Sequence, residues 1–119
     1  MSLEEIVRIL GAEVLPTGER EDVDIVTGCG SDLMSDVLSS AKPGSILLTG
    51  LTTPQAIYTA ELVDIKAVCF VRGKKPPDET VKLATSKGIV LLRTSLPMFE
   101  SCGRLYRSGL KGCSEYEGR

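Results

Sequence analysis

The sequence predicts a single α/β domain made of βαβ units, with a mainly parallel sheet flanked by helices. Short apolar runs of strand length alternate with segments of helical periodicity, and the connections between them are short. Aromatic residues make up only 4% of the chain and Trp is absent, so we expect the aliphatic core that is typical of parallel sheets. The stretch 45–60 follows the order strand, glycine turn, helix. At 119 residues the chain is long enough to bury such a core as one domain, 1–119.

The stretch 45–60 is the clearest unit. Ile46–Leu48 form an apolar run that is too short for a buried helix, and Gly50 ends it. Thr52 or Thr53 is expected to cap the following helix, and Gln55 would complete a capping box with Thr52. Backbone amides that stay free at such a helix N-terminus attract anions.

The remaining elements follow from the same two periodicities. The strands are expected at residues 13–15, 23–27, 45–49, 67–71 and 89–92. The helices are expected to begin near residues 2, 33, 54, 78 and 95.

Polar residues and glycines mark the ends of these helices. Ser2 and Glu5 form a capping box for the first helix, which Gly11 ends. Asp78 is expected to cap the fourth helix, which Gly88 ends.

The last helix is expected to follow a cap by Thr94 or Ser95, with Pro97 near its start. Its buried side is expected to carry Met98, Phe99, Cys102, Leu105 and Tyr106. The polar tail 114–119 is expected to fray, so the ordered core covers about residues 2–110.

Charge and hydropathy exclude several classes of partner. The chain has 14 basic and 16 acidic residues and a net charge of −2, so it lacks the excess of positive charge that attracts nucleic acid or an anionic membrane. No apolar run approaches the length that spans a bilayer, and the N-terminus does not resemble a signal peptide. We therefore expect a cytoplasmic protein that binds neither nucleic acid nor membrane.

The residue types exclude most catalytic and metal chemistry. The chain contains no His, which excludes histidine-based acid–base catalysis and Ser-His-Asp or Cys-His nucleophiles. The four cysteines, Cys29, Cys69, Cys102 and Cys113, form no C-x-x-C pair, so we expect no metal site and no cofactor. No catalytic constellation remains, and we expect a protein that is not an enzyme.

Cys29 is the one cysteine with a reactive context. It lies between two glycines at an expected helix N-terminus, where the helix dipole would lower the pKa of a thiol. The alternative is that Cys29 is a small residue packed into a tight turn. Cys69, in a continuous apolar run, is expected in the core.

Glycines and hydroxyls recur at three expected strand ends, Thr27–Ser31, Thr49–Thr53 and Arg93–Ser95. Ligands of parallel sheets gather outside the carboxyl ends of the strands, so we expect a site for a small anionic ligand there, a nucleotide or another phosphate-containing compound. Arg72 and Arg93 would neutralise its charge. The candidate ligand-binding residues are Gly28, Cys29, Gly30, Ser31, Gly50, Thr52, Thr53, Arg72, Arg93, Thr94 and Ser95. The alternative is that the glycine turns only cap helices and the basic residues are solvated, because no nucleotide-binding fingerprint is present.

The order of motifs over residues 5–110 resembles the DRTGG domain, a small α/β module found alone and attached to phosphotransacetylase-like and CBS-containing proteins. The segments that carry the resemblance are 30–35, 42–50, 60–62, 66–73, 78–84 and 89–94. The chain departs from the motif that names the family. Leu51-Thr52-Thr53 stands in place of the Asp-Arg pair, and Val71-Arg72-Gly73 in place of Thr-Gly-Gly.

The resemblance implies a homodimeric α/β domain with a regulatory, ligand-binding role. Standalone members of the family lie near genes of iron-only hydrogenases and sensor kinases, and the module is similar to the N-terminal domain of HPr kinase. A two-fold contact would use the last helix, whose Met98, Phe99 and Tyr106 are, like Tyr58, core or dimer candidates.

These observations predict a non-catalytic regulatory or adaptor domain, homodimeric, that binds a small anionic ligand or a partner protein at the carboxyl ends of the strands. Two alternatives remain open. One is an accessory component of a phosphoryl-transfer or hydrogenase-related system, and the other is a thiol-based redox sensor that acts through Cys29.

Overall fold

The computed structural model describes residues 1–17 and 23–115. Its α-helices are α1 (Leu3–Leu10), α2 (Met34–Ser40), α3 (Pro54–Leu62), α4 (Asp78–Lys87) and α5 (Met98–Arg107). Its strands are β1 (Glu13–Val14), β2 (Thr27–Gly30), β3 (Ser45–Thr49), β4 (Ala67–Phe70), β5 (Val90–Arg93) and β6 (Lys111–Gly112), and a short 3-10 helix η1 (Cys113–Glu115) follows.

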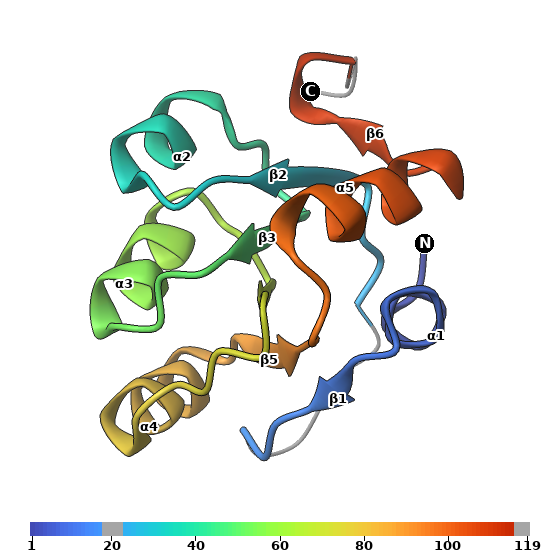
Figure 1. Cartoon of the computed structure of the whole chain (residues 1–119). Helices are drawn as coiled ribbons and strands as arrows, with labels where there is room; N and C mark the ends of the chain where they lie inside the picture. Colours follow the sequence, from blue (N-terminus) through green and yellow to red (C-terminus); the bar gives the residue numbers. More distant parts are fainter. Residues whose placement is uncertain (18–22, 116–119) are drawn as a thin grey trace.

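One sheet with the strand order β1-β5-β4-β3-β2-β6 organises the domain (Figure 1). Neighbouring strands from β5 to β6 are parallel, and β1 pairs antiparallel with the outer edge of β5. The chain steps from β2 to β5 in one direction, and α5 then leads back across the sheet to β6 at the opposite edge. The prediction of a mainly parallel α/β domain with flanking helices is confirmed.

Helices cover both faces of the sheet. Helices α2, α3 and α4 lie on one face, and α1 and α5 lie on the other (Figure 1). Residues of β3 alternate between the two cores, with Ile46 and Leu48 toward α1 and α5 and Leu47 toward the other three helices. Strands β3 and β4 are buried on both faces, which explains why they appear in the sequence as continuous apolar runs. Cys69 is fully buried in β4, as predicted.

The predicted ends of the first and fourth helices are confirmed. Ser2 and Glu5 form the capping box of α1, and Gly11 ends that helix with a φ of 60°. Gly88 ends α4 in the same left-handed conformation, with a φ of 70°. Glycine adopts this conformation without the steric cost that a Cβ atom brings.

One predicted cap is confirmed only in its position, and two are wrong. Thr53 is the N-cap of α3 but its side chain makes no capping bond, and the predicted box between Thr52 and Gln55 is not formed. Asp78 is the first residue of α4 rather than its cap, because Pro77 already has the extended conformation of an N-cap. Pro97 is the N-cap of α5, in place of the predicted Thr94 or Ser95.

The predicted strand at 23–27 is also wrong. Strand β2 is Thr27–Gly30, so both glycines that were assigned to a turn lie inside the sheet. Their lack of side chains fits the packing above them, because α5 lies over Gly30 and Leu110, which follows α5, lies over Gly28. A Cβ atom on Gly30 would lie 2.8 Å from Cys102 Sγ, and one on Gly28 would lie 3.2 Å from Leu110 Cδ2.

The predicted buried side of α5 is confirmed for Leu105 and, half-buried against the core, for Met98 and Cys102, but not for Phe99 and Tyr106. Ser101 and Leu105 are its buried residues, whereas Phe99 is 86% exposed and Tyr106 is 61% exposed. The helix packs on the sheet and on α1 through a narrow face, so the two aromatic rings remain outside the core. The short strand β6 after α5 was not predicted. The predicted frayed tail falls partly on 116–119, outside the described residues.

Candidate ligand site at the strand ends

The register of the parallel strands brings Asp32 beside Gly50. Gly30 is paired with Leu48 and Phe70 with Thr49, so the residues that follow each strand meet at one edge of the sheet. Asp32 Oδ1 accepts a hydrogen bond of 2.6 Å from the Gly50 backbone N–H. The same oxygen accepts a second bond, of 3.2 Å, from Thr49 Oγ1. This edge of the sheet therefore holds an oxyanion, and the chain itself supplies it.

Local hydrogen bonds hold these groups in place. Ser31 Oγ accepts a bond of 3.0 Å from the Leu33 N–H, and the Ser31 N–H donates to the Leu48 carbonyl. Thr49 Oγ1 accepts from the Leu51 N–H at 3.1 Å while it donates to Asp32. The turns after β2 and β3 are thereby fixed relative to each other.

Arg72 lies across Gly50 from the neighbouring strand end. Its backbone has a positive φ of 58°, and its N–H donates to the Leu96 carbonyl at 2.8 Å. A Cβ atom on Gly50 would lie 2.7 Å from Arg72 Nη2 and 3.4 Å from Asp32 Oδ1. The guanidinium therefore lies close against the Gly50 backbone, and a side chain at this position would displace it. The structure brings Ser31, Gly50 and Arg72 together, as the sequence predicted, and adds Asp32, which was not predicted.

The two threonines at the start of α3 do not cap it through their side chains. The Thr52 carbonyl accepts a bond of 2.7 Å from Thr80 Oγ1 on α4, which fixes the turn to the neighbouring helix. Thr53 has the extended backbone of an N-cap with its side chain exposed. The N-terminus of α3 therefore lies next to Gly50 without a side-chain cap.

Arg93, Thr94 and Ser95 belong to a different part of the surface. Arg93 Nη1 donates to Glu13 Oε1 at 2.6 Å, and its Nε and Nη2 donate to the Gly73 carbonyl at 3.2 Å each. Thr94 is buried, and its hydroxyl donates to the Leu10 carbonyl at 2.8 Å. Arg93 and Ser95 line a polar pocket of about 290 Å³ between α1, β1 and the turn after β4. Arg93 therefore does not lie with the glycine turns, where it was expected to neutralise a ligand, because the antiparallel β1 strand supplies its partner.

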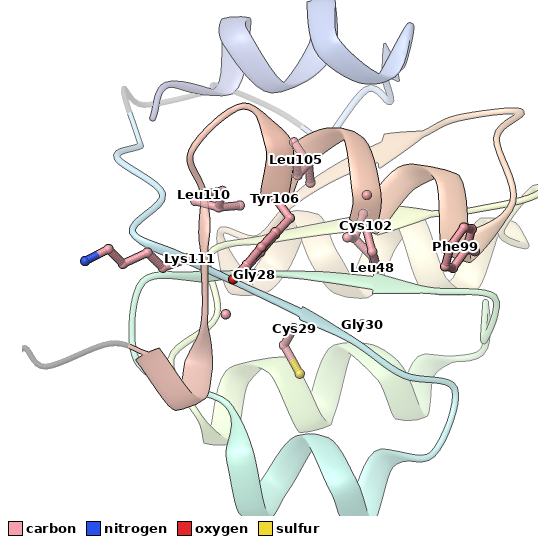
Figure 2. Close-up of a pocket in the computed structure, with 12 residues that line it drawn as sticks. Gly28, Cys29, Gly30, Leu48, Phe99, Cys102, Leu105, Tyr106, Leu110 and Lys111 are labelled. Carbon is pink, nitrogen blue, oxygen red and sulfur yellow. The ribbon is translucent and has the colours of Figure 1, made fainter.

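An apolar pocket of about 330 Å³ lies between β2, α5 and β6, apart from both the Gly50 turn and the Arg93 pocket (Figure 2). Its lining includes Gly28, Cys29 and Gly30. The two glycines leave its floor as bare backbone on the side of α5. Phe99, Tyr106 and Leu110 line its walls, and Lys111 lies at one end. Sequence reasoning missed this pocket because it depends on which strand α5 crosses, although the aromatic residues of α5 were a visible signal.

Cys29 does not lie at a helix N-terminus, because α2 begins only at Met34. Burial in the strand raises the pKa of its thiol to about 11, and the neighbouring Cys113 adds to that shift. The expectation of a lowered pKa is therefore wrong. The helix dipole acts within about one turn of a helix end, and Cys29 lies outside that range.

The described residues contain neither a metal-binding cluster nor a membrane-spanning helix. Over residues 1–17 and 23–115, no group of three or more Cys, Asp or Glu side chains has the arrangement of a metal site. In the same part of the chain, no helix combines the length and apolar character needed to cross a membrane.

Comparisons with known proteins support the fold. No protein-family model matches the sequence, and no curated protein does. Among solved structures, the chain is similar to the CBS and DRTGG domains of the regulatory region of Clostridium perfringens pyrophosphatase, complexed with its activator diadenosine tetraphosphate. The TM-score is 0.73 at 18% sequence identity, over 90% of this chain and 46% of the other, so this chain spans about half the length of that solved chain. The chain thus has a fold found in a CBS and DRTGG regulatory region.

Proposed function

We propose that this chain is a non-catalytic regulatory domain of the DRTGG type, and that it binds a small anionic ligand at the carboxyl ends of β2, β3 and β4. One observation carries the proposal. The Gly50 N–H and Thr49 Oγ1 together hold the Asp32 carboxylate, beside the exposed guanidinium of Arg72. Two hydrogen-bond donors on one oxyanion, with a guanidinium close by, are groups of the kind that bind phosphates and carboxylates.

In this proposal the ligand exchanges with Asp32. A phosphate or carboxylate of the ligand takes the two donors and pairs with Arg72, and the exposed Asp32 side chain turns to solvent. Asp32 lies two residues before α2, so its release changes the turn that leads into that helix. Binding at the strand ends would thereby change the conformation at the start of α2, and a regulatory domain requires such a difference between its bound and free states. Nucleotides are the first compounds to test, because the similar regulatory region was crystallised with a dinucleotide activator.

The experiment is a thermal-shift titration of the full chain with ATP, diadenosine tetraphosphate, acetyl phosphate and inorganic phosphate. A ligand of the folded state raises the melting temperature progressively with its concentration. We expect Arg72→Ala to abolish the shift, and Asp32→Asn to move it to lower ligand concentrations, because a competing negative charge is removed. Arg93→Ala is the matched control, since its guanidinium pairs with Glu13 instead, and it should keep the shift. A shift that survives Arg72→Ala, or that none of the four compounds produces, would refute the anion site.

We further propose that the domain is a homodimer that uses α5. The support is the exposed aromatic pair Phe99 and Tyr106 beside the apolar pocket, because large exposed apolar groups mark interaction surfaces. Light scattering should give a dimer mass for the wild type and a monomer mass for Phe99→Glu. Leu62→Glu is the control, since Leu62 is 75% exposed on α3, on the other face of the sheet. A wild-type monomer, or a dimer that Leu62→Glu disrupts and Phe99→Glu does not, would contradict this interface.

A further inference from the structure

The parallel pairing of β2 with β6 brings two cysteines next to each other. Thr27 is paired with Lys111 and Gly28 with Gly112, and a cysteine follows on each side: Cys29 within β2, and Cys113 at the start of η1 directly after β6. Neighbouring strands lie about 4.8 Å apart, which is within the range of Cα separations that a disulfide spans.

The two thiols also lie on the same face of the sheet. Cys113 Sγ lies 3.5 Å from the Gly28 carbonyl oxygen and 3.7 Å from Thr27 Oγ1. Side chains two residues apart on a strand share a face, so Cys29 points to the same side as Thr27. Figure 2 agrees, because the Cys29 sulfur points away from Tyr106 and Cys102 on α5. Cys102 is on the opposite face and Cys69 is fully buried in β4, so Cys113 is the partner that the geometry offers.

We propose that Cys29 and Cys113 form a reversible disulfide when the protein meets a low-molecular-weight disulfide oxidant. The Cys113 thiolate attacks one sulfur of the oxidant RSSR, which gives a mixed disulfide and releases one RSH. Cys29 then gives up its proton and attacks the Cys113 sulfur, and a second RSH leaves. The two cysteines lose two electrons and two protons, and RSSR gains them. Burial raises the pKa of the Cys29 thiol to about 11, which assigns the first attack to Cys113 and leaves to Cys29 the intramolecular second step.

The disulfide would fix one wall of the apolar pocket. Strand β6 is only two residues long, and its Lys111 and Gly112 line the pocket opposite α5. A covalent bond from Cys113 to β2 would hold that wall in place and close most of the chain into one loop. The bond would therefore stabilise the fold and couple the pocket to the redox state of its surroundings. This inference does not depend on the proposed anion site, because its readouts use no ligand.

The test is oxidation of the reduced full chain with oxidised glutathione, followed by alkylation of the remaining thiols, trypsin digestion and mass spectrometry. We expect one intramolecular cross-linked pair of peptides that contain Cys29 and Cys113. The melting temperature of the oxidised protein should rise by roughly 10 °C. Cys102→Ser should keep both effects, and Cys113→Ser should lose both.

Three results would overturn the proposal. One is a cross-link from Cys29 to Cys102, and another is a disulfide that joins two chains. The third is a stable mixed disulfide with glutathione on Cys113 that Cys29 does not resolve.

Discussion

The close approach of α5 to Gly30 predicts how much a side chain at position 30 destabilises the protein. An added Cβ atom at Gly30 would lie 2.8 Å from Cys102 Sγ and 3.3 Å from Met98 Sδ. The Met98 side chain is flexible and can move, but Cys102 is short and is fixed by its helix. Overpacking of this kind costs about 1–3 kcal/mol, and replacing a strand glycine by alanine returns about 0.5–1 kcal/mol. We expect Gly30→Ala to lower the free energy of unfolding by about 1–2 kcal/mol, or the melting temperature by roughly 5–10 °C.

A double-mutant cycle isolates this contact. Cys102→Ala removes the sulfur and should by itself cost about 1 kcal/mol through lost packing. In the double variant the new Cβ atom of residue 30 occupies the space that the sulfur leaves. The double variant should therefore be at least as stable as Gly30→Ala alone, with a favourable coupling of about 1 kcal/mol. Urea unfolding measures all four corners of the cycle.

The matched control is Gly103→Ala. Gly103 follows Cys102 in α5 and has no atom within 4 Å of an added Cβ atom. It lies inside the helix, so alanine should stabilise the protein by about 0.5–1 kcal/mol. Strictly additive effects of Gly30→Ala and Cys102→Ala, or a Gly30→Ala variant more stable than wild type, would refute the reasoning.

Three further predictions concern stability. Ser2→Ala should cost about 1 kcal/mol in urea unfolding, because the capping bond to the Glu5 N–H is lost; an unchanged unfolding midpoint would contradict this. Thr94→Val should cost about 1–3 kcal/mol, because it leaves the Leu10 carbonyl without the buried Thr94 hydroxyl, whereas Thr94→Ser should recover most of that loss. Burial raises the pKa of the Cys69 thiol from 9.0 to about 12, so the folded state keeps a proton that the unfolded state releases. The free energy of unfolding therefore keeps this contribution below pH 9 and loses it as the pH rises toward 12, by about 4 kcal/mol at most. Cys69→Ala should reduce the loss of stability between pH 9 and 12. An identical loss in both proteins would contradict the prediction.

The central strands and several helix ends could be predicted because their signals are local. The runs at β3 and β4 are apolar at every position, and Ser2, Gly11 and Gly88 carry capping chemistry that depends only on nearby residues. Strand β2 could not be predicted. Half of its residues are glycine, which has no side chain and gives no alternation of polar and apolar positions. Its place in the sheet depends on long-range contacts, namely its pairing with β3 and β6 and the packing of α5, about seventy residues further along the chain.

The candidate site could be predicted only in part, for a similar reason. The glycine turn at Gly50 and the nearby Arg72 follow from the order of strands and turns in the sequence. The group that accepts the hydrogen bond of the Gly50 N–H could not be predicted from the sequence. It is Asp32, which lies 18 residues away and reaches that amide only through the register of β2 and β3. The separation of Arg93 from this site depends on the pairing of β1 with β5, which is again a long-range contact.

The register also explains why the apparent repeat of Thr27-Gly28 and Thr49-Gly50 is not a structural repeat. Thr27 begins its strand and its hydroxyl is bonded to Ser45, whereas Thr49 ends its strand and its hydroxyl is bonded to Asp32. Because Gly28 is paired with Ile46, Thr49 lies level with Ser31 across the sheet. Two glycines with the same neighbour in sequence thus leave room for different groups, the Leu110 side chain over Gly28 and a guanidinium over Gly50. If anion binding belongs to the strand ends, substitutions at Gly50 should affect it directly, and substitutions at Gly28 should act only through the packing of Leu110.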